Sequence, residues 1–252
     1  MTHEEDQVVI VTGAASGIGK ACTDFLLRNG SRVLAADLDA ERLAAAYKAG
    51  SDALVLQACD VSQADDCTTA VKRAKHAFGR VDALIHWAGQ HSTKTWDTLN
   101  AEDFDALLRV NVTGSFLIAQ AAARQMIADG NGGSIVLTGS TAVIHAPIGG
   151  EAGNGGPAYV TAKSAITGMV RSLARALGPS SIRVNAIAPG VTETPMIGNY
   201  SEATRRQQIA TSPLGRIGSA EEVAEAGVML ISSSARYISG EVVIVNGATA
   251  FG

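Results

Sequence analysis

The sequence has few cysteines, no block of like charge and no long apolar run. Its three cysteines, Cys22, Cys59 and Cys67, form no paired motif, which argues against a disulfide framework and against a zinc site. Lys and Arg are scattered and the formal net charge is −4, so a surface for nucleic acid or anionic membranes is not expected. No run approaches the roughly 18 apolar residues of a membrane span, and the acidic residues 1–7 are unlike a secretory signal. These absences favour a cytoplasmic protein with no metal, nucleic-acid or membrane partner.

Short apolar, β-branched runs alternate with segments of helical pattern along the whole chain. The runs cover residues 8–11, 32–36, 53–58, 81–86, 134–138, 182–187 and 241–245. The helical patterns cover residues 20–29, 40–49, 62–78, 101–128, 158–177 and 220–231. This alternation predicts an α/β Rossmann fold, a doubly wound parallel sheet of about seven strands with helices on both faces. No repeat or linker divides the chain, so we expect one dinucleotide-binding and catalytic domain over residues 1–252.

The first predicted strand leads into a glycine-rich turn at residues 12–19, and a predicted helix follows the turn. Glycines let a backbone approach phosphate groups closely, and a helix N-terminus supplies N–H donors and partial positive charge. The spacing is G-x-x-x-G-x-G rather than the G-x-G-x-x-G of the usual fingerprint. A phosphate cradle is favoured, and a glycine turn without a ligand is the alternative.

Asp37 ends the second predicted strand, 18 residues beyond Gly19. A carboxylate at this place can accept hydrogen bonds from an adenosine ribose, and it would repel a 2′-phosphate. No Lys or Arg lies in the glycine turn or directly after Asp37, and Arg42 lies a turn into the next helix. The sequence therefore favours NAD over NADP.

Tyr159 and Lys163 are four positions apart on a predicted helix, so they share one face. A nearby cation favours the phenolate and lowers a tyrosine pKa that is ordinarily about 10. Such a tyrosine can act as a general acid and base near neutral pH. The pair by itself also fits a chance spacing on a solvated helix.

The ordered set of motifs from residue 8 to about residue 247 resembles the short-chain dehydrogenase/reductase family. The resemblance implies that the cofactor-binding positions are Thr12, Gly13, Ser16, Gly17, Ile18, Gly19, Asp37, Asp60, Val61, Ala88, Gly89, Tyr159, Lys163, Pro189, Gly190, Thr192 and Thr194. Among these, Asp37 would select NAD, and Asp60 with Val61 would contact the adenine.

The same resemblance implies a catalytic set of four residues. Ser140 would orient the substrate oxygen and Tyr159 would transfer the proton. Lys163 would lower the pKa of Tyr159 and bind the nicotinamide ribose, and Asn111 would hold a water that links Lys163 to solvent. Hydride would pass directly between the nicotinamide and the substrate carbon. Similar proteins are commonly tetramers, so a homotetramer is expected.

Three features depart from the family pattern. The family usually has Asn-Asn-Ala-Gly where this chain has His86 and Trp87 before Ala-Gly. His86 either supplies a replacement hydrogen bond or is merely buried, and Trp87 either packs or narrows the nicotinamide pocket. The glycine-rich residues 148–157 lengthen the spacing between the serine and the tyrosine, and they are typical of a mobile pocket wall. Asn246 replaces a frequent aspartate and is interpreted as a structural difference.

Several side chains near the predicted pocket have two interpretations. His91 and His145 are expected to be solvated loop histidines rather than substrate contacts. Arg205 and Arg206 lie in a segment that resembles the family's substrate-binding loop, and they are interpreted first as solvated and second as an anion clamp. Small side chains could pack against partner helices or against their own sheet, namely Ala119, Ala122, Ala165, Gly168 and Ala176.

The leading functional prediction is an oxidoreductase that transfers hydride between NAD(H) and a small secondary alcohol, polyol or ketone. One alternative is an NADPH-dependent reductase of carrier-bound 3-oxoacyl groups, against which Asp37 argues. Another is a non-catalytic dinucleotide-binding regulator on the same fold, because a fold alone does not fix a function.

Overall fold

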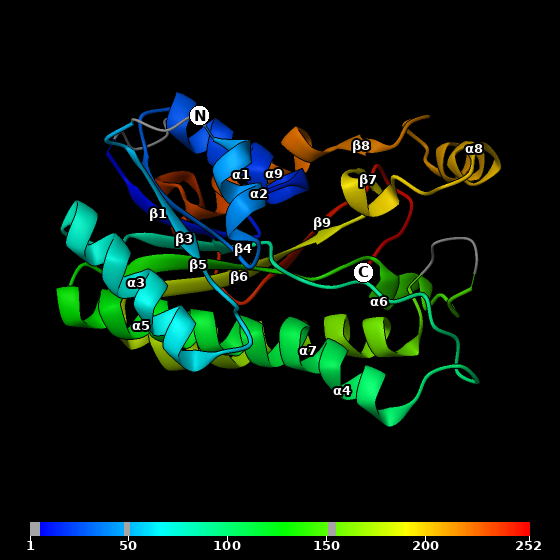
Figure 1. Cartoon of the computed structure of the whole chain (residues 1–252), viewed down its shortest axis with the longest axis horizontal. Coiled ribbons are helices and arrows are strands. Elements are labelled where there is room, and N and C mark those ends of the chain that lie inside the picture. Colours follow the sequence, from blue (N-terminus) through cyan, green and yellow to red (C-terminus); the bar gives the residue numbers. More distant parts are fainter. Residues whose placement is uncertain (1–5, 48–50, 151–154) are drawn as a thin grey trace.

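The computed structural model describes residues 6–47, 51–150 and 155–252. Its centre is a seven-stranded, fully parallel sheet in the order β3-β2-β1-β4-β5-β6-β9 (Figure 1). The strands are β1 (Val8–Thr12), β2 (Arg32–Asp37), β3 (Leu54–Ala58), β4 (Ala83–His86), β5 (Gly133–Thr138), β6 (Ile182–Pro189) and β9 (Val242–Val245). The strand order reverses between β1 and β4, and in such sheets ligands bind at the carboxyl ends beside that point. The predicted single-domain, doubly wound Rossmann fold is confirmed.

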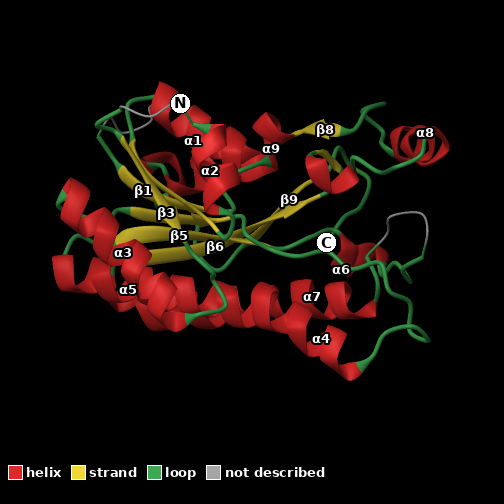
Figure 2. Ribbon diagram, viewed as in Figure 1, coloured by secondary structure: helices red, strands yellow, loops and turns green. Residues whose placement is uncertain are grey.

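Helices cover both faces of the sheet (Figure 2). One face carries α1 (Gly17–Arg28), α2 (Ala40–Ala46) and α9 (Ala220–Ile231), and the other carries α3 (Ala64–Phe78), α5 (Ser115–Asp129) and α7 (Pro157–Leu177). Within β1, Val8 and Ile10 belong to one core and Val9 and Val11 to the other, as the alternation of a strand requires. Every residue of β1 is buried, so the strand at the switch point is fixed from both sides.

The predicted helix over residues 101–128 is interrupted by an unpredicted turn. It consists of α4 (Ala101–Leu108), a six-residue π-helical stretch (Arg109–Gly114) and α5. The whole rod is long and apolar enough to cross a membrane by length and composition, which is weak evidence since the core helix of a soluble protein passes the same test. Its most apolar stretch is 44% buried inside the protein, so we interpret it as a core helix.

Two of the small residues expected at a partner interface are instead part of the core. Ala119 and Ala122 are buried against the protein's own sheet, so that assignment is wrong for them. Ala165, Gly168 and Ala176 lie exposed on α7 and leave its outer face available.

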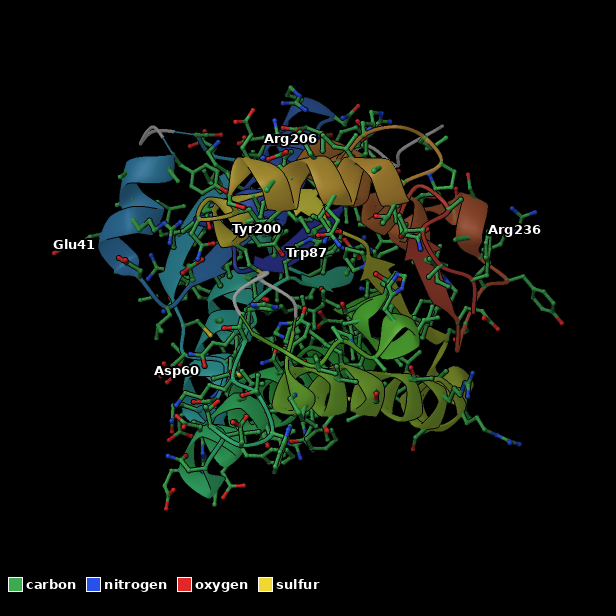
Figure 3. The ribbon with its side chains drawn as sticks, turned by 90° about the vertical axis from the view of Figure 1, so that its right-hand side faces the viewer. Glu41, Asp60, Trp87, Tyr200, Arg206 and Arg236 are labelled. Carbon is green, nitrogen blue, oxygen red and sulfur yellow. The ribbon has the colours of Figure 1, made fainter. Side chains whose placement is uncertain are left out.

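Small elements project from the carboxyl ends of the strands. They are α6 (Ala142–His145), the short parallel pair β7 (Thr192–Glu193) and β8 (Gly218–Ser219), and α8 (Glu202–Thr211). Figure 3 shows this edge from the front. Tyr200 is labelled just below α8, and Asp60 is labelled at the lower left. The sequence predicted only a polar segment in place of β7 and α8. The predicted end of the second helix at residue 49 lies outside the described residues, and α2 ends at Ala46.

Candidate active site

The glycine-rich turn joins β1 to α1 and uses glycine where no side chain fits. Gly13 and Gly17 have φ angles of +68° and +53°, which disfavour other residues. A Cβ on Gly19 would lie 2.1 Å from the backbone oxygen of Gly13. Ser16 is the N-cap of α1 but makes no side-chain capping bond, and no acidic residue occupies the first turn. The first N–H groups of α1 are therefore left for an anionic ligand.

Replacing Gly19 by alanine tests this turn. Because the new Cβ meets a backbone atom rather than a flexible side chain, the turn must open, and dinucleotide binding is expected to weaken by about tenfold or more. Titration of intrinsic fluorescence with NADH measures the affinity. Gly178→Ala is the matched control, because nothing lies within 4 Å of a Cβ at that position. Equal affinities of the two variants would contradict the steric argument.

Asp37 closes the glycine turn from the end of β2. Its Oδ2 accepts a hydrogen bond from the backbone N–H of Ala15 at 2.9 Å. Asp60 follows the neighbouring β3, where its Oδ1 accepts a bond from the Ser62 N–H at 2.9 Å. Val61 packs against the π-helical stretch, where a Cβ on Gly114 would lie 2.9 Å from Val61 Cγ2. The predicted adenosine-binding residues thus occupy one continuous rim.

His86 and Trp87 occupy the place of the usual asparagine pair at the end of β4. His86 is buried and its Nδ1 lies 2.7 Å from Thr12 Oγ1, so the replacement hydrogen bond is present. Burial, with a smaller contribution from the positive charge of Lys163, lowers the pKa of His86 to about 3. Trp87 points to the other face of the sheet, where a Cβ on Gly227 of α9 would lie 2.7 Å from its ring. Trp87 therefore packs against α9, which is the first of its two sequence interpretations.

Ala88 and Gly89 connect the glycine turn to the interior of the site. A Cβ on Gly13 would lie 2.7 Å from the Ala88 nitrogen. A Cβ on Gly89 would lie 2.8 Å from Asn111 Oδ1 and 3.6 Å from Lys163 Nζ. Gly13, Asn111 and Lys163, which are far apart in the sequence, therefore meet around Ala88 and Gly89. The small size of these two residues allows the close approach.

Asn111 lies in the π-helical stretch and is buried. Its Nδ2 donates to the carbonyl oxygens of Gln90 at 3.0 Å and Leu107 at 3.1 Å. Its Oδ1 is buried and has no hydrogen-bond partner within the described parts of the chain. A buried acceptor without a partner is costly, and it is commonly satisfied by an ordered water or a ligand group.

Ser140 and Tyr159 come together at the carboxyl edge although they belong to different elements. Ser140 follows β5, and its Oγ accepts a bond from the Ala142 N–H at 3.1 Å. The Ser140 side chain lies near enough to the Tyr159 hydroxyl to favour its ionised form, which lowers the pKa of Tyr159. Burial has the larger and opposite effect, so the pKa of Tyr159 is raised overall. Tyr200 of the segment before α8 adds to this rise.

Lys163 lies one turn after Tyr159 on α7. Its Nζ donates to the Thr138 carbonyl at 3.0 Å and lies 5.7 Å from the centre of the Tyr159 ring. Burial lowers the pKa of Lys163 to about 8. The predicted net lowering of the Tyr159 pKa is not found in the protein chain alone, because burial of the phenol raises this pKa by more than the neighbouring side chains lower it.

His91 also contacts the tyrosine, contrary to the prediction of a solvated histidine. The ring centres of His91 and Tyr159 are 4.6 Å apart and their planes meet at 70°, an edge-to-face arrangement. The position of His91, two residues after Gly89 and beyond the carboxyl end of β4, is the sequence signal that could have indicated this contact. His145, at the end of α6, is exposed as predicted.

Residues after β6 complete the site. The Thr141 N–H donates to the Pro189 carbonyl at 3.1 Å, which ties the Ser140 loop to β6. Thr192 Oγ1 donates to the Gly190 carbonyl at 3.0 Å. A Cβ on Gly17 would lie 3.2 Å from the methyl group of Thr194, so Thr194 faces the glycine turn.

The remaining sequence interpretations concern structural and charged side chains. Asn246 accepts from the Ala248 N–H and donates to the Ala250 carbonyl, so its role in the chain is structural as predicted. Arg205 forms two bonds to Glu193, at 2.7 and 2.9 Å, and Arg206 pairs with Glu202 at 3.7 Å. These pairs favour the solvated interpretation of both arginines. In the described residues no group of three or more His, Cys, Asp or Glu is arranged to hold a metal.

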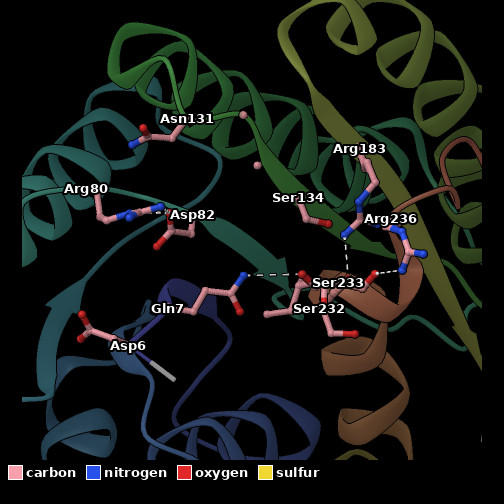
Figure 4. A pocket seen from close by; sticks show the side chains of 13 residues that line it. Asp6, Gln7, Arg80, Asp82, Asn131, Ser134, Arg183, Ser232, Ser233 and Arg236 are labelled. Atoms are coloured by element: carbon pink, nitrogen blue, oxygen red, sulfur yellow. Dashed lines mark hydrogen bonds and ion pairs between the residues drawn. The ribbon is translucent and has the colours of Figure 1, made fainter. Parts of the chain in front are cut away.

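A hollow of about 340 Å³ lies at the opposite edge of the sheet, around the amino ends of the strands (Figure 4). Arg183 on its wall donates to the carbonyls of Ile238 and Ser232, and Arg80 pairs with Asp82. None of the residues predicted to bind cofactor or substrate lines it.

Comparison with known proteins shows to which family this chain is related. A family model described as enoyl-(acyl carrier protein) reductase matches residues 13–248. The chain belongs to the short-chain dehydrogenase/reductase family. Members of this family are oxidoreductases of hydroxyl and keto groups that use a nicotinamide dinucleotide, and this short-chain dehydrogenase/reductase is such an oxidoreductase.

Relatives of this short-chain dehydrogenase/reductase act on different compounds. It is 35% identical to the 3-oxoacyl-(acyl-carrier-protein) reductase of Thermotoga maritima, over 96% of this chain and 97% of the relative. It is 37% identical to a 3alpha-hydroxysteroid dehydrogenase of Mediterraneibacter gnavus, over 97% of each chain. A crystal structure from Brucella melitensis, titled as a glucose/ribitol dehydrogenase of the family, superposes with a TM-score of 0.91 at 29% identity, and the match covers 100% of each chain.

Proposed function

We propose that this protein interconverts a small secondary alcohol, such as a polyol, and the corresponding ketone with NAD(H), and that Tyr159 is its general acid and base. The neighbourhood of the Tyr159 and Ser140 side chains, close enough for Ser140 to lower the pKa of Tyr159, is the observation that carries the proposal, because it gives two hydroxyl groups that can both reach one substrate oxygen. Lys163 lies beside Tyr159, and near Lys163, at Gly89, lies Asn111 Oδ1, which has no hydrogen-bond partner among the described residues.

The residues present fit a dinucleotide. The open N-terminus of α1 and the glycine turn suit a pyrophosphate, with Thr12, Gly13, Ser16, Gly17, Ile18 and Gly19 around it. Asp37, Asp60 and Val61 would hold the adenosine half, and Ala88, Gly89, Pro189, Gly190, Thr192 and Thr194 would border the nicotinamide half. When bound, the dinucleotide supplies the atom that accepts or donates the hydride.

The chain's own residues would perform the proton transfer and the positioning. Ser140 Oγ would donate to the substrate oxygen and hold it next to the Tyr159 hydroxyl. Tyr159 would take the alcohol proton during oxidation and return it to the carbonyl oxygen during reduction. The ammonium of Lys163 would stabilise the phenolate and hold the nicotinamide ribose hydroxyls, and Asn111 would bind a water between Lys163 and solvent.

NAD is the proposed cofactor because of the charges around Asp37. A 2′-phosphate would approach the Asp37 carboxylate, which already accepts from the glycine turn. The nearest lysine of α1, Lys20, is paired with Asp24 at 2.6 Å, and that pairing reduces the positive charge it could offer to a phosphate. Repulsion between like charges at such distances costs on the order of 1–4 kcal/mol.

Replacing Asp37 by asparagine should therefore reduce the preference for NAD. We expect kcat/KM with NADP(H), relative to NAD(H), to rise by about tenfold or more, since the repulsion disappears while a hydrogen-bonding side chain remains. Asp39→Asn is the matched control, because Asp39 caps α2 through the Arg42 N–H and asparagine caps helices equally well. A parent enzyme that prefers NADPH would refute the cofactor assignment.

The alternative substrate is a 3-oxoacyl group on a carrier protein, which the name of the Thermotoga relative supports. The pairing of Arg205 with Glu193 and of Arg206 with Glu202 disfavours an acidic partner at α8, because both guanidinium charges are already compensated. A screen of secondary alcohols, polyols, ketones and 3-oxoacyl thioesters, followed by the absorbance of the reduced cofactor, distinguishes the two. Turnover of the thioesters alone would overturn the small-alcohol proposal.

A cytoplasmic homotetramer is the proposed assembly, since α7 presents Ala165, Gly168 and Ala176 on an exposed face where helices could approach closely. Light scattering at micromolar concentration would measure the mass of the particle, and a monomer would refute this assembly.

A further inference from the structure

His91 is the unexplained side chain at the catalytic tyrosine. Its ring stands edge-to-face with the Tyr159 ring, with centres 4.6 Å apart. A Cβ on Gly155 would lie 2.5 Å from Tyr159 Cδ1, so the chain leaves room there only for glycine. The Tyr159 ring is thus approached closely by both a glycine and an imidazole.

The loop that carries His91 is fixed on both sides of the histidine. Before it, the Gln90 carbonyl accepts from Asn111 Nδ2 at 3.0 Å. After it, the Ser92 carbonyl accepts from the Gly156 N–H at 2.8 Å. A Cβ on Gly156 would lie 1.9 Å from the Lys94 carbonyl oxygen, so this close backbone approach depends on glycine.

The same bonds explain the glycine-rich segment before Tyr159. The Gly150 N–H donates to the Thr93 carbonyl at 2.8 Å, and Gly149 has a φ of +84°. Both described ends of the segment therefore attach to the loop after β4, while residues 151–154 lie outside the described chain. The attachment delivers His91 and Tyr159 to the site as one unit.

The hydrogen-bonding capacity of the His91 ring is unused in the part of the chain that the structure describes. Within the described residues, no hydrogen bond is made by either ring nitrogen. Burial, with a smaller effect of the Lys163 charge, lowers the pKa of His91, so the imidazole is neutral at pH 7. A neutral imidazole presents one N–H donor and one nitrogen acceptor. A hydroxyl group, which both donates and accepts, can be bound by either nitrogen.

Charges near the site do not favour an acidic substituent. Arg205 and Arg206 are paired with Glu193 and Glu202, and Lys94, three residues after His91, is paired with Asp103. On the His91 side of the reacting carbon, a carboxylate would therefore meet a neutral imidazole, and the proposed place of Lys163 is beneath the tyrosine and the nicotinamide ribose. A neutral hydroxyl fits these surroundings better.

We propose that His91 is a specificity-determining residue that binds a hydroxyl group on the carbon next to the reacting one. The preferred substrates are then vicinal diols and α-hydroxyketones. This inference rests on the proposed function, because the reacting oxygen must lie at Ser140 and Tyr159 for its neighbour to lie at His91.

The test compares matched alcohols that differ in one hydroxyl group. The pairs are isopropanol with propylene glycol, sec-butanol with its vicinal diol, and cyclohexanol with its vicinal diol, each assayed with both cofactors. His91→Phe keeps an aromatic ring against Tyr159 and removes both nitrogens. We expect kcat/KM for the diols to fall by about tenfold or more, while that for the mono-alcohols changes by less than about threefold.

Two further variants separate recognition from packing. His91→Asn restores a donor and an acceptor and should recover part of the diol preference. His76→Phe, the same substitution on the exposed surface of α3, should leave both rates unchanged. An equal loss for diols and mono-alcohols in His91→Phe, or no loss for either, would refute the role of His91 alone. Turnover of none of the compounds by the parent protein would refute the proposed function and, with it, this inference.

Discussion

Tyr159→Phe is expected to remove nearly all turnover in both directions while leaving the fold and NADH affinity intact. The substitution removes one oxygen atom, and with it the partner of Ser140 and the proposed proton donor and acceptor. The aromatic ring stays, so its contacts with His91 and Gly155 are kept. General acid–base catalysis contributes about 10²–10⁴-fold, and we expect kcat to fall by that factor.

The pKa shifts at the site give this prediction a pH dependence. Because burial raises the pKa of Tyr159, the phenol keeps its proton at pH 7 in the chain alone. The protonated form is the one needed to reduce a ketone, and the phenolate is the one needed to oxidise an alcohol. Oxidation by the parent enzyme should therefore accelerate as pH rises from 7 to 9, and this rise should be absent from any residual activity of Tyr159→Phe.

Tyr237→Phe is the matched control for this variant. Tyr237 is fully exposed, so the same loss of a hydroxyl group there should change neither kcat nor KM. Stopped-flow measurement of hydride transfer, together with an NADH titration, separates chemistry from binding. If Tyr159→Phe retained a rate close to that of the parent, another group would have to carry the proton and the mechanism would be wrong.

Local sequence patterns were sufficient for the fold and for much of the site. Each strand of the seven-stranded sheet is a short, mostly apolar run and the helices between them have their own periodicity, so the alternation predicts a doubly wound sheet without knowledge of contacts. In such a sheet, residues that follow the carboxyl ends of strands meet at one edge. That rule placed Asp37, Asp60 and Ser140 correctly, because their positions depend only on where a strand ends.

The features that the sequence did not predict depend on contacts between distant segments. The π-helical stretch that holds Asn111 contains weak helix formers (Val, Asn, Thr and Gly) inside an otherwise helical pattern, but its geometry is visible only beside Gln90 and Gly89. Trp87 directly follows β4, and its ring points toward the face of the sheet that α9 covers. Gly227 of α9 leaves the space that the ring occupies. The sequence indicated a solvated loop position for His91. In the structure, hydrogen bonds from the Gly150 and Gly156 N–H groups hold the His91 loop against the segment that carries Tyr159.

The pKa of Tyr159 illustrates the same limit in electrostatic terms. Spacing in sequence showed that Lys163 would lie near the phenol, which is correct. It could not show how strongly both groups are desolvated, and in the folded chain desolvation dominates the pKa of each. The burial of the ammonium has a consequence for stability that can be measured.

Lys163→Met is expected to inactivate the enzyme and, at the same time, to stabilise the cofactor-free protein. Methionine has a similar length and fills the same space, but it carries no charge. Loss of the cation that would stabilise the phenolate should lower kcat by about a hundredfold or more. The lowering of the Lys163 pKa from 10.5 to about 8 corresponds to a burial cost of about 3 kcal/mol.

The sign of the stability effect depends on pH. Below pH 8 the lysine is protonated in the folded and in the unfolded chain, so the full burial cost destabilises the parent. Between pH 8 and 10.5 the folded protein releases the proton first, and the cost disappears as pH rises. The melting temperature of Lys163→Met should therefore exceed that of the parent by about 5 °C or more at pH 7, and the difference should shrink by pH 10.

The change in melting temperature distinguishes two roles of Lys163. Either its buried charge is kept for catalysis at a cost in stability, or the side chain only packs. The bond from Lys163 to the Thr138 carbonyl is lost in the variant and offsets about 1 kcal/mol of the gain. Lys72→Met, on the exposed surface of α3, is the matched control and should change neither activity nor the pH dependence of melting. A variant that is both inactive and less stable at pH 7 would mean that Lys163 holds the site together. An inactive but more stable variant would mean that the protein keeps a destabilising charge because proton transfer at Tyr159 requires it.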